Sequence, residues 1–118
     1  MEFLNRIELR GVVGRADINT VHGSQVCNFS VVTEYSGVDK EGNSAIDTTW
    51  FNVSAWGGRE GIPDLYSIQK GAWIQVVGRI RLRKYTNQNQ EERTSMDVLA
   101  RNVKLIPREQ DPMQVQRD

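Results

Sequence analysis

Hydrophobic and polar residues alternate along most of this chain, and Gly and Asn interrupt the alternation at short intervals. A β-strand sends successive side chains to opposite faces, so a period of two residues indicates strands that are buried on one side. Five segments show this pattern, and we predict strands at residues 3–15, 25–35, 47–56, 72–85 and 94–106. The sequence has no heptads, internal repeats or low-complexity tracts, which argues against coiled coils and solenoids.

A different period occurs between the third and fourth predicted strands, where Ile62, Leu65 and Ile68 recur at helical spacing. Pro63 suits a first helical turn and Gly71 a position just past a C-terminus, so we predict one short helix here. The element order is then β-β-β-α-β-β. This order predicts an all-β fold, a five-stranded OB barrel with one short helix between strands 3 and 4.

The length of 118 residues suits one domain, which we place at residues 1–107. Residues 108–118 are polar and include a proline, so we expect a short disordered tail. The longest apolar runs are only a few residues, which excludes a membrane-spanning helix, and the N-terminus shows no secretory signal. We therefore expect a cytoplasmic protein without a membrane partner.

Few residues could carry catalysis or bind a metal. Cys27 is the single cysteine and His22 the single histidine, and neither has a neighbour at metal-ligand spacing. Asp47, Asp64 and Asp97 fall on different predicted elements and form no acidic pair. We therefore expect no enzyme activity, metal, cofactor or small-molecule substrate, and keep a hydrolase or nuclease only as a remote alternative.

The formal net charge is zero, but the charges are unevenly distributed. Residues 1–68 carry five basic and nine acidic side chains, whereas residues 69–108 carry nine basic and three acidic ones. The local field decides whether a polyanion is attracted, so the second half of the chain is the candidate surface for nucleic acid.

The third predicted strand places large aromatic side chains on a polar face. Alternation puts Phe51, Val53 and Ala55 on one face, which suits a core, and Trp50 and Trp56 with Asn52 and Ser54 on the other. An aromatic ring stacks on any base, so two outward tryptophans favour binding to single-stranded nucleic acid. The alternative is that one or both rings fill the core or a subunit interface.

The fourth predicted strand places a row of positively charged side chains on one face. Ile80 and Leu82 alternate with a row formed by Arg79, Arg81, Arg83 and Tyr85. Guanidinium groups in a row can follow a phosphate backbone while the ring stacks on a base. In isolation such a run would indicate only a solvated strand face, but together with the tryptophan face it favours a binding surface.

From about Phe3 to Ile106 the chain resembles the bacterial single-stranded DNA-binding protein family. The matching motifs, which keep the family's order and spacing, are Asn5-Arg-Ile-Glu-Leu-Arg-Gly11, Asn28-Phe-Ser-Val31, Thr49-Trp50, Val53 to Gly57, Lys70-Gly71 and Gly78-Arg-Ile-Arg-Leu-Arg-Lys-Tyr85. The resemblance implies an OB fold, sequence-tolerant binding of single-stranded DNA in replication, recombination or repair, and a cytoplasmic, nucleoid-associated location. It also implies a homo-oligomer, usually a tetramer, with a dimer as the alternative.

The resemblance further assigns roles to individual residues. Family stacking positions fall on Trp50, Trp56 and Tyr85, and basic positions on Arg81, Arg83 and Lys84. Tyr35 and Gly37 compete for one more family aromatic, and we take Tyr35.

Two segments depart from the family. The Thr86 to Glu92 tip lacks the usual glycine turn, and the chain ends at Asp118 without the family's glycine-rich tail and its acidic tip. The second departure predicts a short, accessory form of the family. It also keeps open a rival function, an OB-fold protein-interaction module of the primosome-adaptor type that binds nucleic acid weakly.

Overall fold

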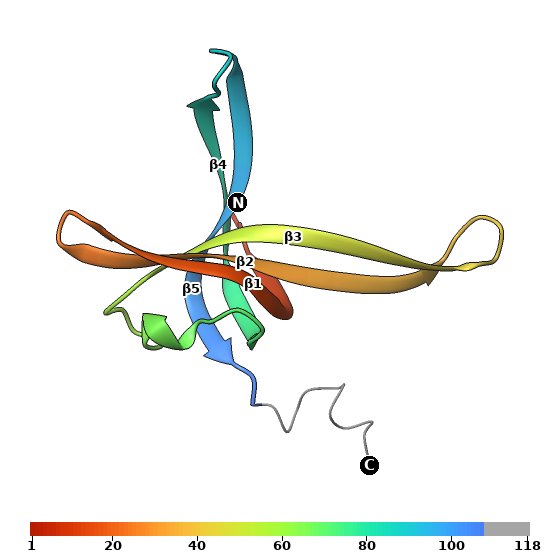
Figure 1. The fold of residues 1–118 in the computed structure, drawn as a ribbon, viewed down its shortest axis with the longest axis horizontal. Coiled ribbons are helices and arrows are strands. Elements are labelled where there is room, and N and C mark those ends of the chain that lie inside the picture. The colour runs from red at the N-terminus through yellow and green to blue at the C-terminus, as the bar shows by residue number, and fades with distance from the viewer. Residues whose placement is uncertain (108–118) are drawn as a thin grey trace.

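Five strands close into a barrel in the computed structural model, which describes residues 1–107 and confirms the all-β prediction (Figure 1). The predicted tail, residues 108–118, lies outside the described residues. Around the barrel the strands follow the order β1-β2-β3-β5-β4. Their bounds are β1 Ile7–Val21, β2 Ser24–Val38, β3 Ser44–Trp56, β4 Trp73–Thr86 and β5 Glu92–Leu105.

Barrel closure depends on two different kinds of pairing. The first part of β1 pairs with β4 from Ile7 to Val12, and the remainder pairs with β2 from Val12 to Val21. β3 then meets β5 in a short parallel seam, where Asn52, Val53 and Ser54 face Asp97, Val98 and Leu99. The other neighbouring pairs are antiparallel.

The barrel interior is filled by alternate residues of every strand, as the period of two predicted. Phe29, Val31, Val53, Ile74 and Val98 are at most 2% exposed and come from four strands. Leu65 and Ile68, from the segment between β3 and β4, join the same core.

The helix between β3 and β4 is a single 3-10 turn, η1 Leu65–Ser67. The backbone N–H of Tyr66 donates to Oδ1 of Asp64 (3.0 Å), which caps the turn. Pro63 therefore precedes the cap rather than starting a longer helix. One turn is enough because Leu65 and Ile68, three residues apart, are both buried against the barrel. Within residues 1–107 no helix is long and apolar enough to cross a membrane.

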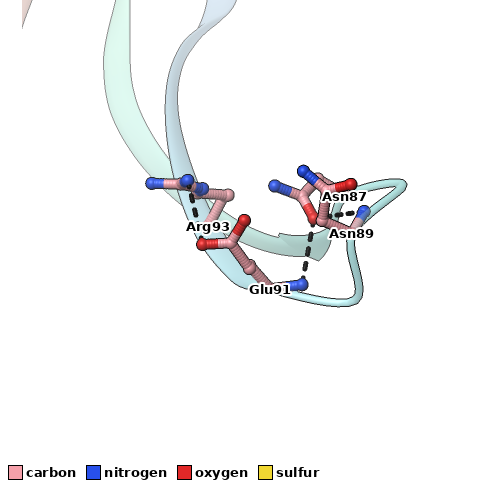
Figure 2. A network of polar contacts seen from close by, with 4 residues as sticks. All are labelled: Asn87, Asn89, Glu91 and Arg93. Carbon is pink, nitrogen blue, oxygen red and sulfur yellow. Dashed lines mark hydrogen bonds and ion pairs between the residues drawn. The ribbon is translucent and has the colours of Figure 1, made fainter.

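The β2–β3 and β4–β5 hairpins extend beyond the barrel in different directions (Figure 1). At the β4–β5 tip, Oδ1 of Asn87 accepts hydrogen bonds from the backbone N–H groups of Asn89 and Glu91, both at 2.9 Å (Figure 2). Arg93 pairs with Glu91 across 3.2 Å at the base of the same tip. The tip turns without glycine because Gln90 adopts a positive φ of 61°.

The β2–β3 tip is built in the same way. Oδ1 of Asp39 accepts from the backbone N–H groups of Glu41 and Asn43, both at 2.9 Å. Here a glycine, Gly42, takes the positive φ of 85°. An Asx side chain at the first loop position therefore fixes both tips, and this interaction replaces the family's glycine turn at the β4–β5 tip.

Candidate nucleic-acid interface

Both tryptophans of β3 lie on the outer face of the barrel, as alternation predicted. Val53 and Ala55 are buried and Phe51 packs against the core from the partly buried side. Trp50 is 59% exposed and Trp56 is half-buried. Neither ring belongs to the hydrophobic core, which leaves an aromatic face accessible to a flat ligand.

A β-bulge in β1 makes room for the Trp50 ring. Val13 pairs with Val31 and Arg15 with Ser30, so Gly14 is an extra residue between them. A Cβ atom at Gly14 would overlap Cζ3 of Trp50 and lie 2.8 Å from Cη2. The indole therefore rests directly on the glycine backbone and crosses from β3 over β2 to β1.

The arginine row of β4 shares the outer face with β5 and β3. Across β4 and β5, Arg79, Arg81 and Arg83 stand opposite Leu99, Asp97 and Ser95. Because Asp97 is also paired with Asn52 of β3, one lateral row runs from Asn52 through Asp97 to Arg81. The short parallel seam thus places the tryptophan strand and the arginine strand on a single surface.

A cleft of about 540 Å³, the first cleft, joins one end of this surface to β1 and β2. Three predicted residues line it together, namely Arg83, Lys84 and Tyr85. The opposite wall is polar and comes from β1, β2 and β3, through Arg15, Asn28, Asn52 and Ser54. The Ser54 hydroxyl donates to Oδ1 of Asn28 (2.8 Å), which fixes part of this wall.

Sequence reasoning missed several lining residues of the first cleft. Alternation along β3 had already placed Asn52 and Ser54 beside the tryptophans, so a signal for them existed. Arg15 and Asn28 carry no local signal, because only the pairing of β1 with β2 and β2 with β3 brings them to the cleft.

A carboxylate partly offsets the arginine row. Asp97 is 3% exposed, and its Oδ2 lies 2.8 Å from Nη2 of Arg83. The pair is a charge contact rather than an aligned hydrogen bond, since no donor is directed at this Oδ2 within residues 1–107. Nε of the neighbouring Arg81 is also buried without a hydrogen-bond partner in that part of the chain.

The first cleft is not lined by the other five predicted residues, Trp50, Trp56, Arg81, Arg79 and Tyr35. Arg79, at the other end of the row, lines a second cleft. Tyr35 is 75% exposed on the β2–β3 hairpin, opposite Asp47. Strand alternation places Tyr35 on the side of Phe29 and Val31, opposite the side of Trp50. Its role in binding stays a prediction.

Metal-binding and thiol chemistry find little support in the described residues. Residues 1–107 contain no group of three or more His, Cys, Asp or Glu side chains that could hold a metal ion. Cys27 is fully buried, and this burial, with a smaller contribution from the charge of Asp17, raises the thiol pKa to about 11. The thiol therefore stays protonated at neutral pH.

Comparison with known proteins gives consistent matches. A model of the single-strand binding protein family matches residues 4–106. A single-stranded DNA-binding protein of Neisseria meningitidis is 33% identical over 105 residues, covering 87% of this chain and 60% of that protein. Single-stranded DNA-binding protein 1 of Xylella fastidiosa is 30% identical over 114 residues, covering 94% of this chain and 83% of that one. This chain thus spans about 60% of the length of the Neisseria relative.

Solved structures show the same fold. A structure described as Plasmodium falciparum SSB in complex with ssDNA superposes with a TM-score of 0.75 at 26% identity, covering 90% of this chain and 96% of that one. A deletion mutant of the single-stranded DNA binding protein from Thermus aquaticus superposes with a TM-score of 0.71 at 21% identity, covering 88% of this chain and 51% of that one. The second likeness concerns the fold alone.

Proposed function

Because this chain belongs to the single-strand binding protein family, we propose that it binds and protects single-stranded DNA, without selecting a sequence, during replication, recombination or repair. One observation carries the proposal: Trp50 and Trp56 lie on the outer face of β3, which shares one surface with the arginine row of β4 across the intervening strand β5. A base has a π face whatever its identity, so aromatic stacking holds any sequence and contributes about 1–3 kcal/mol per base.

In the proposed complex, aromatic side chains hold the bases and basic side chains hold the phosphates. Bases stack on Trp50, Trp56 and Tyr85, while phosphates lie against Arg83 and Lys84 in the first cleft. Duplex DNA binds poorly because its bases are already stacked on one another and present no free face to the rings. No bond is made or broken, so the protein acts without catalysis or a cofactor.

The test is a titration that follows tryptophan fluorescence, with oligo-dT in one arm and duplex DNA in the other. We expect a strong quench by oligo-dT and little change with duplex, because only unpaired bases can reach the rings. Equal quenching by both ligands would refute the stacking model. No quench by either ligand would favour the protein-interaction module instead.

We also propose that the protein assembles with itself, as a tetramer or else as a dimer. Leu82 and Met96 are cross-strand neighbours on the β4–β5 hairpin, and they are 69% and 48% exposed. Phe3 and Leu4, just before β1, are 92% and 87% exposed. Apolar surface of this kind supports an interface between subunits. Light scattering at micromolar concentration should report an oligomer, and a monomer would contradict the proposal.

The proposed location is the cytoplasm, in association with the nucleoid. Fluorescent tagging in cells would test it, since a diffuse signal away from the DNA would contradict nucleoid association.

A further inference from the structure

A second cleft of about 450 Å³ lies where the β4–β5 sheet meets the segment that follows Trp56. Arginines from four different segments line it: Arg6 before β1, Arg59 after β3, Arg79 on β4 and Arg101 on β5. Glu60 is its acidic lining residue, and Leu4, Val77, Leu99 and Ala100 supply apolar surface. Of the four arginines, sequence reasoning had assigned Arg79 alone to DNA binding.

The walls of this cleft are held in place by the backbone. Gly61 has a positive φ of 88°, and its carbonyl accepts a hydrogen bond from the N–H of Val103 on β5 (2.8 Å). A Cβ atom at Gly61 would lie 2.9 Å from the carbonyl oxygen of Arg101, so the loop packs tightly against β5. The segment that carries Arg59 is therefore anchored beside Arg101.

Arg101 itself is directed by a second bulge. Val77 pairs with Asn102 and Gly78 with Ala100, which leaves Arg101 as the extra residue of β5. Bulges redirect side chains and recur next to functional sites. This bulge brings Arg101 into one cleft with Arg79 of the arginine row.

Positive charge is less compensated in the second cleft than in the first. Arg6 pairs with Glu8 at 2.9 Å, but Arg59, Arg79 and Arg101 have no carboxylate within 4.0 Å among residues 1–107. In the first cleft, by contrast, Arg83 lies against Asp97. Three guanidinium groups without an ion-pair partner among residues 1–107, facing one acidic lining residue, Glu60, favour an anionic ligand.

The second cleft is continuous with the stacking surface. Cζ of Arg59 lies 6.0 Å from the centroid of the Trp56 ring, and Arg79 belongs to the same row as Arg83. We propose that the second cleft binds the phosphodiester backbone of the strand whose bases stack on Trp56, so that the DNA path continues past β3 over Arg59 and Arg101. This inference rests on the proposed function.

The salt dependence of binding tests the inference, because each phosphate contact releases a condensed counterion. For single strands log K falls with log salt by roughly 0.7 per phosphate contact, so Arg59→Gln/Arg101→Gln should flatten the slope by about 1.4. Between about 50 and about 200 mM salt the unmodified protein should then lose about sevenfold more affinity for oligo-dT than the variant does.

Two variants serve as matched controls. Arg59→Lys/Arg101→Lys retains both charges and should keep most of the slope. Arg10→Gln/Lys70→Gln removes two charges that line neither cleft and should leave the slope nearly unchanged. Glu60→Gln removes the negative charge that lines this cleft, so it should raise the affinity for oligo-dT at low salt. Circular dichroism melts should show that every variant folds.

The outcomes separate this inference from the proposed function. If the unmodified protein binds oligo-dT and Trp50→Ala weakens binding, but the Arg59/Arg101 pair behaves like the Arg10/Lys70 pair, the second cleft is not part of the path. If the unmodified protein does not bind oligo-dT at all, the proposed function itself fails.

Discussion

Replacing Gly14 with alanine should weaken DNA binding by moving a side chain on another strand. The added methyl group would occupy space now filled by Cζ3 and Cη2 of Trp50, so the indole must tilt or shift away from β1. Gly14 does not have a positive φ, and alanine therefore fits its backbone without strain. The substitution perturbs the stacking surface while adding no charge and removing no contact group.

The size of the effect is bounded by the stacking energy of one base. That energy is about 1–3 kcal/mol, which corresponds to about fivefold to about 140-fold in affinity. A displaced but still exposed ring retains some contact, so Gly14→Ala should cost no more than Trp50→Ala. Thermal stability should change little, because Trp50 is 59% exposed and can move into solvent.

A double-mutant cycle measures whether the effect passes through Trp50. Anisotropy of labelled oligo-dT gives the affinity of Gly14→Ala, Trp50→Ala and the double variant. Once the indole is absent, the methyl group has nothing to displace, so Gly14→Ala should cost almost nothing in the Trp50→Ala background. Two results would refute the proposed support of Trp50 by Gly14. One is an equal loss of affinity from Gly14→Ala in the unmodified protein and in the Trp50→Ala variant, and the other is no loss in the unmodified protein.

Further changes test other parts of the structure. Trp56→Ala should weaken binding to oligo-dT by about 1–3 kcal/mol with an unchanged melting curve, and an unfolded variant would instead assign Trp56 a packing role. Asp97→Asn frees Arg83 from its carboxylate and should raise affinity for oligo-dT at low salt, so a loss of affinity in a folded variant would contradict that pairing. Gln90→Gly removes a left-handed non-glycine residue and should raise stability by up to about 1 kcal/mol in a denaturant titration; a lower midpoint would show that Gln90 makes a needed contact. Burial raises the pKa of the Cys27 thiol from 9.0 to about 11, so the stability it contributes is present below pH 9 and is lost as pH rises toward 11. Cys27→Ala should flatten that part of the stability profile, and an unchanged profile would rule out this cause.

Alternation within single strands was the dependable part of the sequence prediction. It placed Trp50 and Trp56 outward and Val53 inward, and it separated Leu82 from the arginines, because a period of two is a property of each strand alone. The helix was predicted from the spacing of Ile62, Leu65 and Ile68 and from Pro63 and Gly71 at its ends. The observed element is a single 3-10 turn, shorter than the expected helix, because burial of Leu65 and Ile68 needs only one turn.

Features that depend on register between strands could not be predicted. Asp97 had no visible partner in the sequence, and only the pairing of β5 with β4 and β3 brings it beside Arg83. Likewise, nothing local marks Gly14 or Arg101 as bulge residues, since a bulge is defined by the strand opposite. Of these registers, the second cleft depends on the pairing of β4 with β5, where Arg101 is the extra residue.

The parallel seam between β3 and β5 also bears on the order of folding. The β1–β2–β3 meander and the β4–β5 hairpin can each form through antiparallel neighbours, whereas the two contacts between these halves, the β1–β4 pairing and the β3–β5 seam, join segments far apart in the chain at a higher entropic cost. Before these two contacts form, Trp50 belongs to one half and Arg83 to the other. If the protein binds DNA as proposed, a strand in the first cleft contacts both halves and stabilises the seam between them. Bound DNA should therefore slow hydrogen exchange at Val53 and Val98 more than in the hairpin tips.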